Sequence, residues 1–254
     1  MKVHLLVTNP LHAERWASEL SFRSIRTGFP TFQIHAQLNG CEAVNFKPRE
    51  GVIVEEGPAT NHHRWIHELI SCLDEPFIIA DTDLIFYADM EKIFTDFVSR
   101  GTLLAGQFIP QHRCDFNKCV TRARLHTALM FINPVGVRMA LARMLVEFPA
   151  QAFRDVDLLE YLKPRYEARR GEDGHRQRIF WDTASGLYHV TGGEAFDERA
   201  LYCYHHLAAG TWAKLAVAGG VKHLEDYHQS ILAHPESGRG GWVQQEEYYA
   251  ARRV

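Results

Sequence analysis

The chain has 254 residues, a length that suits one large α/β domain or two small ones. Its residues are 46% hydrophobic and 23% charged, the profile of an ordinary soluble globular protein rather than of a disordered or fibrous one. The net charge of −3 gives no general attraction for nucleic acid or anionic lipid, so we expect no nucleic-acid partner.

The sequence also indicates a compartment. No apolar stretch approaches the ~20 residues that span a bilayer, so no transmembrane segment is expected. The first residues enter a strand pattern and lack the basic region and apolar core of a signal peptide. Five cysteines, an odd number, fit reduced thiols better than a disulfide framework. These features favour the cytoplasm, with peripheral contact with a membrane left open.

Strand and helix patterns alternate through the N-terminal part of the chain, as they do in βαβ units. Asn61 is expected to cap a helix that places Trp65, Leu69 and Ile70 on one face, and Asp89 to open another. Residues 151–178 are polar and show no clear period, and the last third mixes short strands with loops. The predicted strands are 3–7, 32–36, 77–80, 103–106 and 125–133, and the predicted helices are 14–26, 61–73, 89–101 and 137–147.

Asp81 and Asp83 directly follow the most apolar predicted strand, residues 77–80. Ligands of an open parallel sheet bind just beyond the carboxyl ends of the strands. Two carboxylates two residues apart at such an end can converge on one cation, and Mg²⁺ and Mn²⁺ prefer oxygen ligands that they share with substrate phosphates. The pair therefore predicts a divalent-metal site, in which the ion would act as a Lewis acid toward a diphosphate leaving group.

A second pattern lies at residues 204–212 (YHHLAAGTW). His206 is the candidate third metal ligand, because neutral imidazole is a common ligand. Gly210 allows close approach of the backbone to a phosphate, and Thr211 and Trp212 can donate hydrogen bonds to its oxygens. A loop with a buried Trp and incidental histidines is the alternative interpretation.

Together these residues resemble a glycosyltransferase of the GT-A fold. Residues 77–89 (FIIADTDLIFYAD) are similar to the metal-binding strand of the glycogenin-like and galactosyltransferase-like families. Residues 125–133 (LHTALMFIN) are similar to the acceptor-side strand of those families. Residues 191–193 (TGG) and the later His206 to Trp212 pattern resemble the C-terminal motifs of initiating mannosyltransferase-like families. The resemblance extends from about residue 3 to residue 212, in the expected order.

The resemblance implies an α/β fold of the GT-A (Rossmann-like) type, with a mixed, mostly parallel sheet flanked by helices. It implies a single domain over 1–254, with a nucleotide-binding half at 1–100, an acceptor half at 101–227 and a tail or lid at 228–254. The implied activity is transfer of a hexose, with retention of configuration, from a UDP- or GDP-sugar to a glycan, lipid or protein.

The resemblance also implies a set of site residues. Asp81, Asp83 and His206 would bind Mn²⁺ or Mg²⁺ and the donor diphosphate, and the end of the first strand would hold the base and ribose. The implied donor-binding residues are Val7, Thr8, Asn9, Arg64, Asp81, Thr82, Asp83, Asn133, Gly210, Thr211 and Trp212. Asp182, next to Trp181, is the candidate catalytic base, nucleophile or orienting group, and a surface cap is its alternative role.

Some residues depart from these families. Gly193 stands where proline is usual, and residues 126–128 (HTA) replace the Asn-Ser-Gly of galactosyl-type members. The Lys-Pro-Trp ending of the glycogenin type is absent from the sequence. The resemblance therefore stays at the level of the fold and implies a different sugar or acceptor.

Three other functions compete with this one. A phosphatase of the HAD-like type would use Asp81 as its nucleophile, although such enzymes carry the motif in their first strand and follow it with Gly-Thr or Gly-Val. A non-catalytic relative would bind a nucleotide or a carbohydrate. A structural zinc site would use His112, Cys114, Cys119 and His126, whose spacing matches no standard zinc knuckle.

Overall fold

The computed structural model describes residues 1–7, 21–40, 51–114, 119–147, 158–170 and 176–206. The chain forms two compact units that interleave along the sequence. The first takes its described residues from Met1–Ala59, Ile79–Asp96 and Phe196–Val254, and the second from Thr60–Ile78 and Phe97–Ala195. The predicted division into halves at residue 100 stays a prediction. Among the described residues, no helix is long and apolar enough to cross a membrane.

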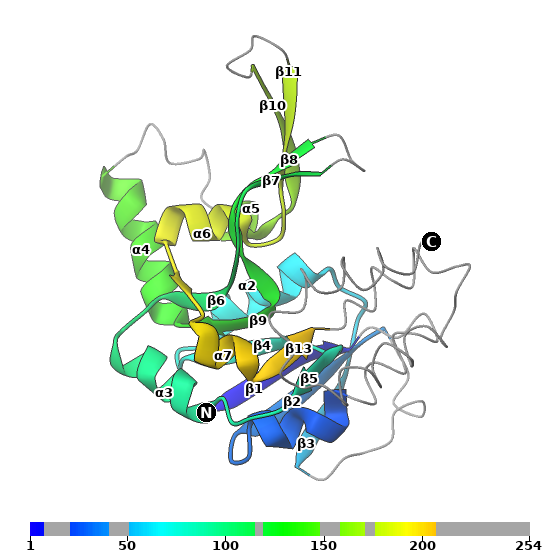
Figure 1. The fold of residues 1–254 in the computed structure, drawn as a ribbon. Coiled ribbons are helices and arrows are strands. Elements are labelled where there is room, and N and C mark those ends of the chain that lie inside the picture. Colours follow the sequence, from blue (N-terminus) through cyan, green and yellow to red (C-terminus); the bar gives the residue numbers. More distant parts are fainter. Residues whose placement is uncertain (8–20, 41–50, 115–118, 148–157, 171–175, 207–254) are drawn as a thin grey trace, which may run out of the picture. The chain divides into compact units, whose positions relative to one another are not determined.

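The fold class is α/β with a mixed sheet and flanking helices, as predicted (Figure 1). The principal sheet has seven strands in the order β12-β6-β9-β4-β1-β2-β3. Its pairs β1–β2, β2–β3 and β6–β12 are parallel, whereas β6 and β9 are antiparallel. A four-stranded sheet, β10-β11-β8-β7, and the pair β13–β5 complete the strands.

The first unit is built on parallel strands whose side chains alternate. Along β2, Ile34, Ala36 and Leu38 are buried while the residues between them are not, which is the period of a strand with one core face. β3 at the edge is mostly exposed and was not predicted, because its sequence VIVEEG lacks a buried face. The strands are β1 (Lys2–Val7), β2 (Gln33–Asn39), β3 (Val52–Gly57), β5 (Leu84–Phe86) and β13 (Tyr204–His206), and helix α7 spans Glu198–Tyr202.

Two elements lie where the chain passes between the units. β4 (Phe77–Asp81) begins with four consecutive buried apolar residues, as expected for a central strand covered on both faces. α3 (Glu91–Ser99) begins where the Asp89 carboxylate accepts a hydrogen bond from the Glu91 N–H at 2.7 Å. A helical segment at 21–28 matches the end of the predicted 14–26 helix, whose first residues lie outside the described part.

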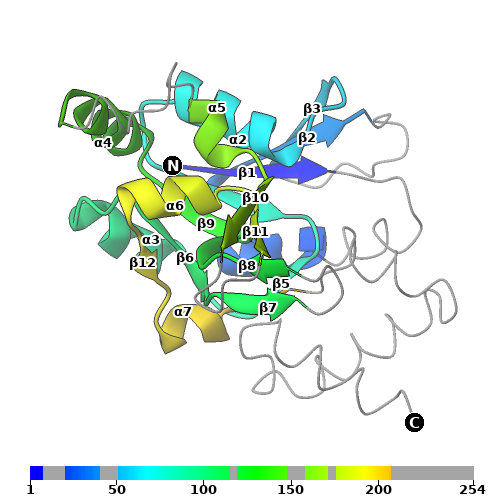
Figure 2. The same ribbon diagram turned by 90° about the horizontal axis from the view of Figure 1, so that it is seen from above.

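The second unit combines helices with the remaining strands. α2, α4, α5 and α6 pack on one another, and α6 also packs on β9; α2 and α5 lie side by side in Figure 2. The helices are α2 (His62–Cys72), α4 (Pro134–Glu147), α5 (Leu158–Leu162) and α6 (Ser185–Thr191). The strands are β6 (Leu104–Ile109), β7 (His112–Cys114), β8 (Cys119–Thr121), β9 (Arg124–Ile132), β10 (Arg165–Arg170), β11 (Arg176–Trp181) and β12 (Glu194–Ala195).

Several details of the second unit differ from the prediction. α2 buries Trp65, Ile66 and Ile70, so Ile66 rather than Leu69 completes its core face. β10 and β11 form a ribbon that extends away from the helices of their unit (Figure 1). The sequence did not predict this ribbon, because its arginine-rich strands alternate too weakly to be recognised.

Candidate metal and donor site

Asp81 and Asp83 lie on either side of a tight connection between β4 and β5. The apolar strand β4 ends at Asp81, Thr82 is buried, and Asp83 precedes the fully buried strand β5. The chain thus passes from one buried strand into another within two residues. The two carboxylates between them are held half-buried rather than in open solvent.

His206 reaches this connection through strand pairing. β13 runs antiparallel to β5, with His206 opposite Leu84, the residue after Asp83. The Cys203 carbonyl extends the contact by accepting a hydrogen bond from the Tyr87 N–H at 2.7 Å. The preceding helix α7 is capped by Asp197, whose carboxylate accepts from the Ala200 N–H at 3.0 Å. Local backbone structure therefore fixes where the imidazole lies.

The three side chains form a compact cluster. Ligand atoms of Asp81, Asp83 and His206 all lie within 4.8 Å of one another, and among the described residues this is the group of such side chains able to hold a metal ion. His206 Nε2 lies 3.2 Å from Asp83 Oδ1, and the two side chains are only 9% and 14% exposed. The structure thus brings together the three residues that the sequence nominated as metal ligands.

The electrostatics of the cluster favour a cation. Burial lowers the pKa of His206, but the charges of Asp83 and Asp81 and the hydrogen bond to Asp83 raise it, and the net direction is upward. Half-buried carboxylates are costly unless a positive charge compensates them. In the protein as described, a protonated imidazole can supply that charge, and a bound divalent ion would replace the proton.

The donor set fits a hard divalent ion. Two carboxylates suit Mg²⁺ and Mn²⁺, and imidazole is an accepted additional ligand. Ligands bound at about 2.1 Å from one ion lie at most about 4.2 Å apart, so a cluster of this size needs only a small contraction to coordinate it. Further positions on the ion would be left for the oxygens of a ligand.

The other predicted donor residues are placed differently. Val7 ends β1 and is fully buried. Arg64 is an exposed residue of α2 in the second unit. Thr8, Asn9, Gly210, Thr211 and Trp212 lie outside the described residues.

Asn133, also predicted to bind the donor, has a structural task in the second unit. Its side-chain oxygen accepts a hydrogen bond from the Gly136 N–H at 3.0 Å, and its carbonyl accepts from the Val137 N–H at 3.0 Å. Both contacts are those of a helix N-cap, with Pro134 as the first residue of α4. The sequence missed this role because the proline was interpreted as the end of a strand rather than as the start of a helix.

Asp182 lies in the second unit beside an arginine that the sequence did not single out. Arg124 Nη2 lies 2.8 Å from Asp182 Oδ2, and Asp182 Oδ1 accepts from the Thr183 N–H at 2.8 Å. Burial lowers the pKa of the Arg124 guanidinium, and Asp182 opposes that shift. Ala184 follows with φ at +60°, a left-handed conformation that costs energy in any residue other than glycine. The signal available in the sequence was the alternation of residues 122–124 (RAR) before an apolar strand.

Three of the four residues of the possible zinc site lie on the paired strands β7 and β8. Cys114 and Cys119 are opposite each other where β7 pairs with β8, and His112 is opposite Thr121. Cys119 is buried. These pairings describe a short hairpin, and within the described side chains no zinc-type cluster is formed there.

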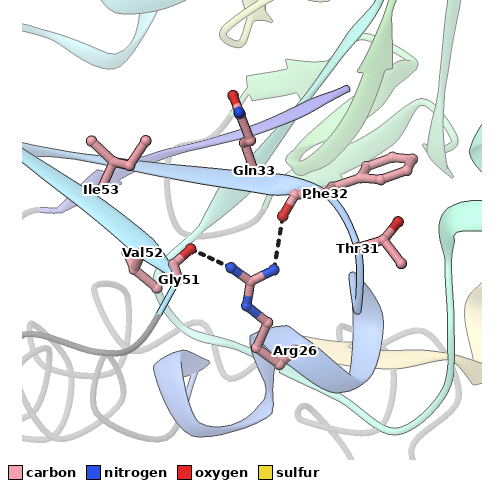
Figure 3. Close-up of a pocket in the computed structure, with 7 residues that line it drawn as sticks. All are labelled: Arg26, Thr31, Phe32, Gln33, Gly51, Val52 and Ile53. Carbon is pink, nitrogen blue, oxygen red and sulfur yellow. Dashed lines mark hydrogen bonds between the residues drawn. The ribbon is translucent and has the colours of Figure 1, made fainter.

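A cavity of about 450 Å³ lies elsewhere in the first unit, at the start of β2 and β3 (Figure 3). Arg26 crosses it and donates hydrogen bonds to the carbonyls of Phe29, Phe32 and Gly51. Gly51 has φ at +73°, and a Cβ there would meet the guanidinium. Arg26 therefore links the backbone of residues 29–32 to that of Gly51 through hydrogen bonds. The lining residues are Arg26, Thr31, Phe32, Gln33, Gly51, Val52 and Ile53.

Comparison with known proteins returns glycosyltransferases by structure alone. No family model and no curated protein sequence matches the chain. The apo form of the glycosyltransferase GlyE of Streptococcus pneumoniae matches with 10% identity and a TM-score of 0.44, over 88% of this chain and 50% of GlyE. This chain thus spans half the length of that protein.

The galactosyltransferase LgtC gives similar values. An active-site mutant matches with 10% identity and a TM-score of 0.45, over 91% of this chain and 96% of the mutant. A complex of LgtC with donor and acceptor sugar analogues matches with 9% identity and a TM-score of 0.42, over 78% of this chain and 74% of LgtC. Because these identities and TM-scores are low, a function has to be inferred from the Asp81, Asp83 and His206 cluster itself.

Proposed function

We propose that this chain is a metal-dependent glycosyltransferase that moves a sugar from a nucleotide-diphosphate sugar to an acceptor. The cluster of Asp81, Asp83 and His206 carries the proposal, because two carboxylates at a strand end and a third ligand from a distant strand suit an ion bound to a diphosphate. The order of the sequence motifs, from residues 77–89 to 204–212, supports the same activity.

The chain's own residues would divide the work. Asp81, Asp83 and His206 would hold Mn²⁺ or Mg²⁺, which when bound supplies Lewis-acid stabilisation of the departing diphosphate. The backbone after Val7, with Thr8 and Asn9, would hold the base and ribose of a UDP- or GDP-sugar. The remaining donor contacts would come from Arg64, Thr82, Asn133, Gly210, Thr211 and Trp212.

Asp182 remains the proposed acceptor-side acid. Its contact with Arg124 at 2.8 Å fixes the orientation of the carboxylate, which suits a base, a nucleophile or an orienting group. The acceptor is proposed to be a glycan, a lipid or a protein, and the transferred sugar a hexose with retained configuration. We assign the activity to the cytoplasm, with peripheral membrane contact as an open alternative.

The experiment that tests this function combines nucleotides with metal. Thermal unfolding is measured with UDP, GDP and CDP, each with Mn²⁺, with Mg²⁺ and with EDTA, and hydrolysis of the corresponding sugar nucleotides is followed in parallel. We expect one nucleotide to raise Tm in a metal-dependent way, and its sugar derivative to be hydrolysed slowly without acceptor. An Asp83→Asn variant should lose both effects. Glu55→Gln, an exposed carboxylate of β3, is the matched control and should keep them.

Two results would count against the proposal. The first is the absence of any metal-dependent stabilisation by the three nucleotides in a folded protein. The second is hydrolysis of an aryl phosphate without nucleotide preference, combined with its loss in an Asp81→Asn variant, which is the behaviour of a phosphatase with an aspartate nucleophile.

A further inference from the structure

Three buried nitrogen atoms in the second unit have no hydrogen-bond acceptor among the described residues. They are Nε of Arg122, Nη1 of Arg124 and Nε1 of Trp181. All three groups are donors that cannot accept a hydrogen bond at neutral pH. Buried donors are nearly always satisfied in folded proteins, so three in one neighbourhood require an explanation.

The three residues lie near one another, at Trp181 and its neighbour Asp182. The guanidinium carbon of Arg122 lies 5.1 Å from the ring centroid, and the His189 ring lies 5.0 Å from it. Arg124 contacts Asp182, the residue after Trp181, at 2.8 Å. The side chains of Arg124 and Trp181 are 12% and at most 9% exposed, so bulk water solvates them poorly.

Strand pairing holds these segments together. β8 and β11 run parallel, with Thr121 opposite Phe180, and the Arg122 N–H donates to the Phe180 carbonyl at 3.0 Å. Arg122 and Trp181 therefore each follow a paired position on adjacent strands. The backbone pairing of β8 with β11 therefore sets the positions of Arg122 and Trp181.

The local charges leave a positive surplus. Asp182 neutralises Arg124, and Glu167 contacts Arg165 Nε at 3.5 Å. Arg122 has only the neutral Gln111 amide oxygen, at 3.4 Å from its Nη1, as its side-chain hydrogen-bond partner among the described residues. Within the described part of the chain, the Arg122 guanidinium thus has no carboxylate partner, and two further donors are unsatisfied.

We propose that Arg122, Arg124 and Trp181 bind an oxyanionic group, a phosphate or a carboxylate, of a ligand. A water molecule must itself donate two hydrogen bonds, whereas a phosphate or a carboxylate only accepts them. The anion also carries the negative charge that would compensate the Arg122 guanidinium. The inference uses none of the metal-cluster residues, although Arg124 also contacts Asp182, the proposed acceptor-side acid.

The test removes hydrogen-bond donors of the site one at a time and measures phosphate affinity. Inorganic phosphate is titrated into the protein by calorimetry in EDTA, and sodium chloride at equal ionic strength provides the reference. Trp181→Phe removes one N–H but keeps an aromatic ring, and Arg122→Gln removes the unpaired charge. Each should weaken phosphate binding roughly ten-fold, the usual effect of losing one hydrogen bond to a charged group. A second titration with acetate distinguishes a phosphate site from a carboxylate site.

The matched control is Arg165→Gln. Arg165 also stacks on Trp181, at 4.6 Å from the centroid, but its guanidinium already contacts Glu167 and donates to the Glu160 carbonyl at 3.1 Å. Its loss should change phosphate affinity by no more than about three-fold, because the charge that is removed is already compensated by Glu167. Saturable binding to neither anion overturns the proposal, as does an equal loss in Arg165→Gln and Trp181→Phe. If Trp181→Phe fails to fold, the comparison of Arg122→Gln with Arg165→Gln decides.

Discussion

His206 Nε2 lies 3.2 Å from Asp83 Oδ1, although the two residues come from distant parts of the chain. Antiparallel pairing of β13 with β5 sets this distance, since it places His206 opposite the residue that follows Asp83. The cluster therefore depends on the docking of a short C-terminal strand as much as on the aspartate motif.

Removing the imidazole should weaken the metal site while leaving both carboxylates in place. We expect His206→Gln to lower Mn²⁺ affinity by at least about ten-fold, because even residues that only support a metal ligand contribute ten- to a hundred-fold. Electron paramagnetic resonance of free Mn²⁺ during a titration measures the affinity directly. His189→Gln, in the second unit, is the control. Unchanged Mn²⁺ affinity in His206→Gln would remove His206 from the ligand set.

The sequence predicted the parts of this site that are local. Asp81 and Asp83 were identified because an apolar run ends at them, and such a run is a reliable sign of a buried strand. His206 was nominated from its place in a motif, and its contact with Asp83 depends on a strand pairing that no local pattern encodes. Asn133 was assigned to the donor, while in the structure its side chain caps α4.

The elements that the sequence missed share a physical reason. β3 lies at a sheet edge with little burial, and β10 is half solvated and rich in arginine, so neither carries the apolar alternation that marks a strand. The helices α6 and α7 are seven and five residues long, too short to show a helical period. Strands and helices that are stabilised by tertiary contacts, and that have no clear hydrophobic period, cannot be predicted from the local sequence.

Gly28 is required by close packing beneath the metal-site strands. A Cβ at this position would lie 2.6 Å from Cγ and Cδ1 of Phe86, a buried residue of β5. Gly28→Ala should therefore lower the free energy of unfolding by about 1–3 kcal/mol, the usual cost of overpacking a core. Urea unfolding followed by circular dichroism gives the value.

The neighbouring exposed residue provides the control for Gly28. Thr27→Ala, in the same helical segment, should change the free energy of unfolding by less than about 0.5 kcal/mol. A Gly28→Ala/Phe86→Leu double variant should recover part of the loss, because the smaller side chain relieves the clash. A Gly28→Ala protein as stable as the parent would show that Phe86 has room to move.

His4 should make the protein sensitive to acid. Burial lowers the pKa of His4 to about 4, with His35 and Lys2 adding to the shift, and the two rings stack at 5.4 Å. Because the folded pKa lies below the unfolded value of 6.5, the unfolded chain binds more protons between these two values. The contribution of neutral His4 to the free energy of unfolding is thus fully present above pH 6.5. It is lost as the pH falls toward 4.

The size of the acid effect follows from the shift. A lowering of the His4 pKa from 6.5 to about 4 corresponds to at most about 3–4 kcal/mol of folding free energy. His4→Phe keeps an aromatic ring against His35 but cannot bind a proton, so its urea midpoint should fall less between pH 7 and pH 4.5. His112→Phe, an exposed histidine of β7, is the comparison and should keep the full acid sensitivity. Parallel pH curves for His4→Phe and the parent protein would refute the assignment.

Asn133 offers a way to separate a structural role from a donor-binding one. Asn133→Ala removes the side-chain oxygen that accepts from the Gly136 N–H, so it should lower the free energy of unfolding by about 1 kcal/mol. Asn133→Asp keeps an oxygen at the cap and should restore the stability, since aspartate is an equally good N-cap residue. A donor-binding residue would behave differently, because a carboxylate repels a diphosphate. If Asn133→Asp is as stable as the parent but loses metal-dependent nucleotide binding, Asn133 contacts the donor; if it keeps that binding, the residue acts through α4 alone.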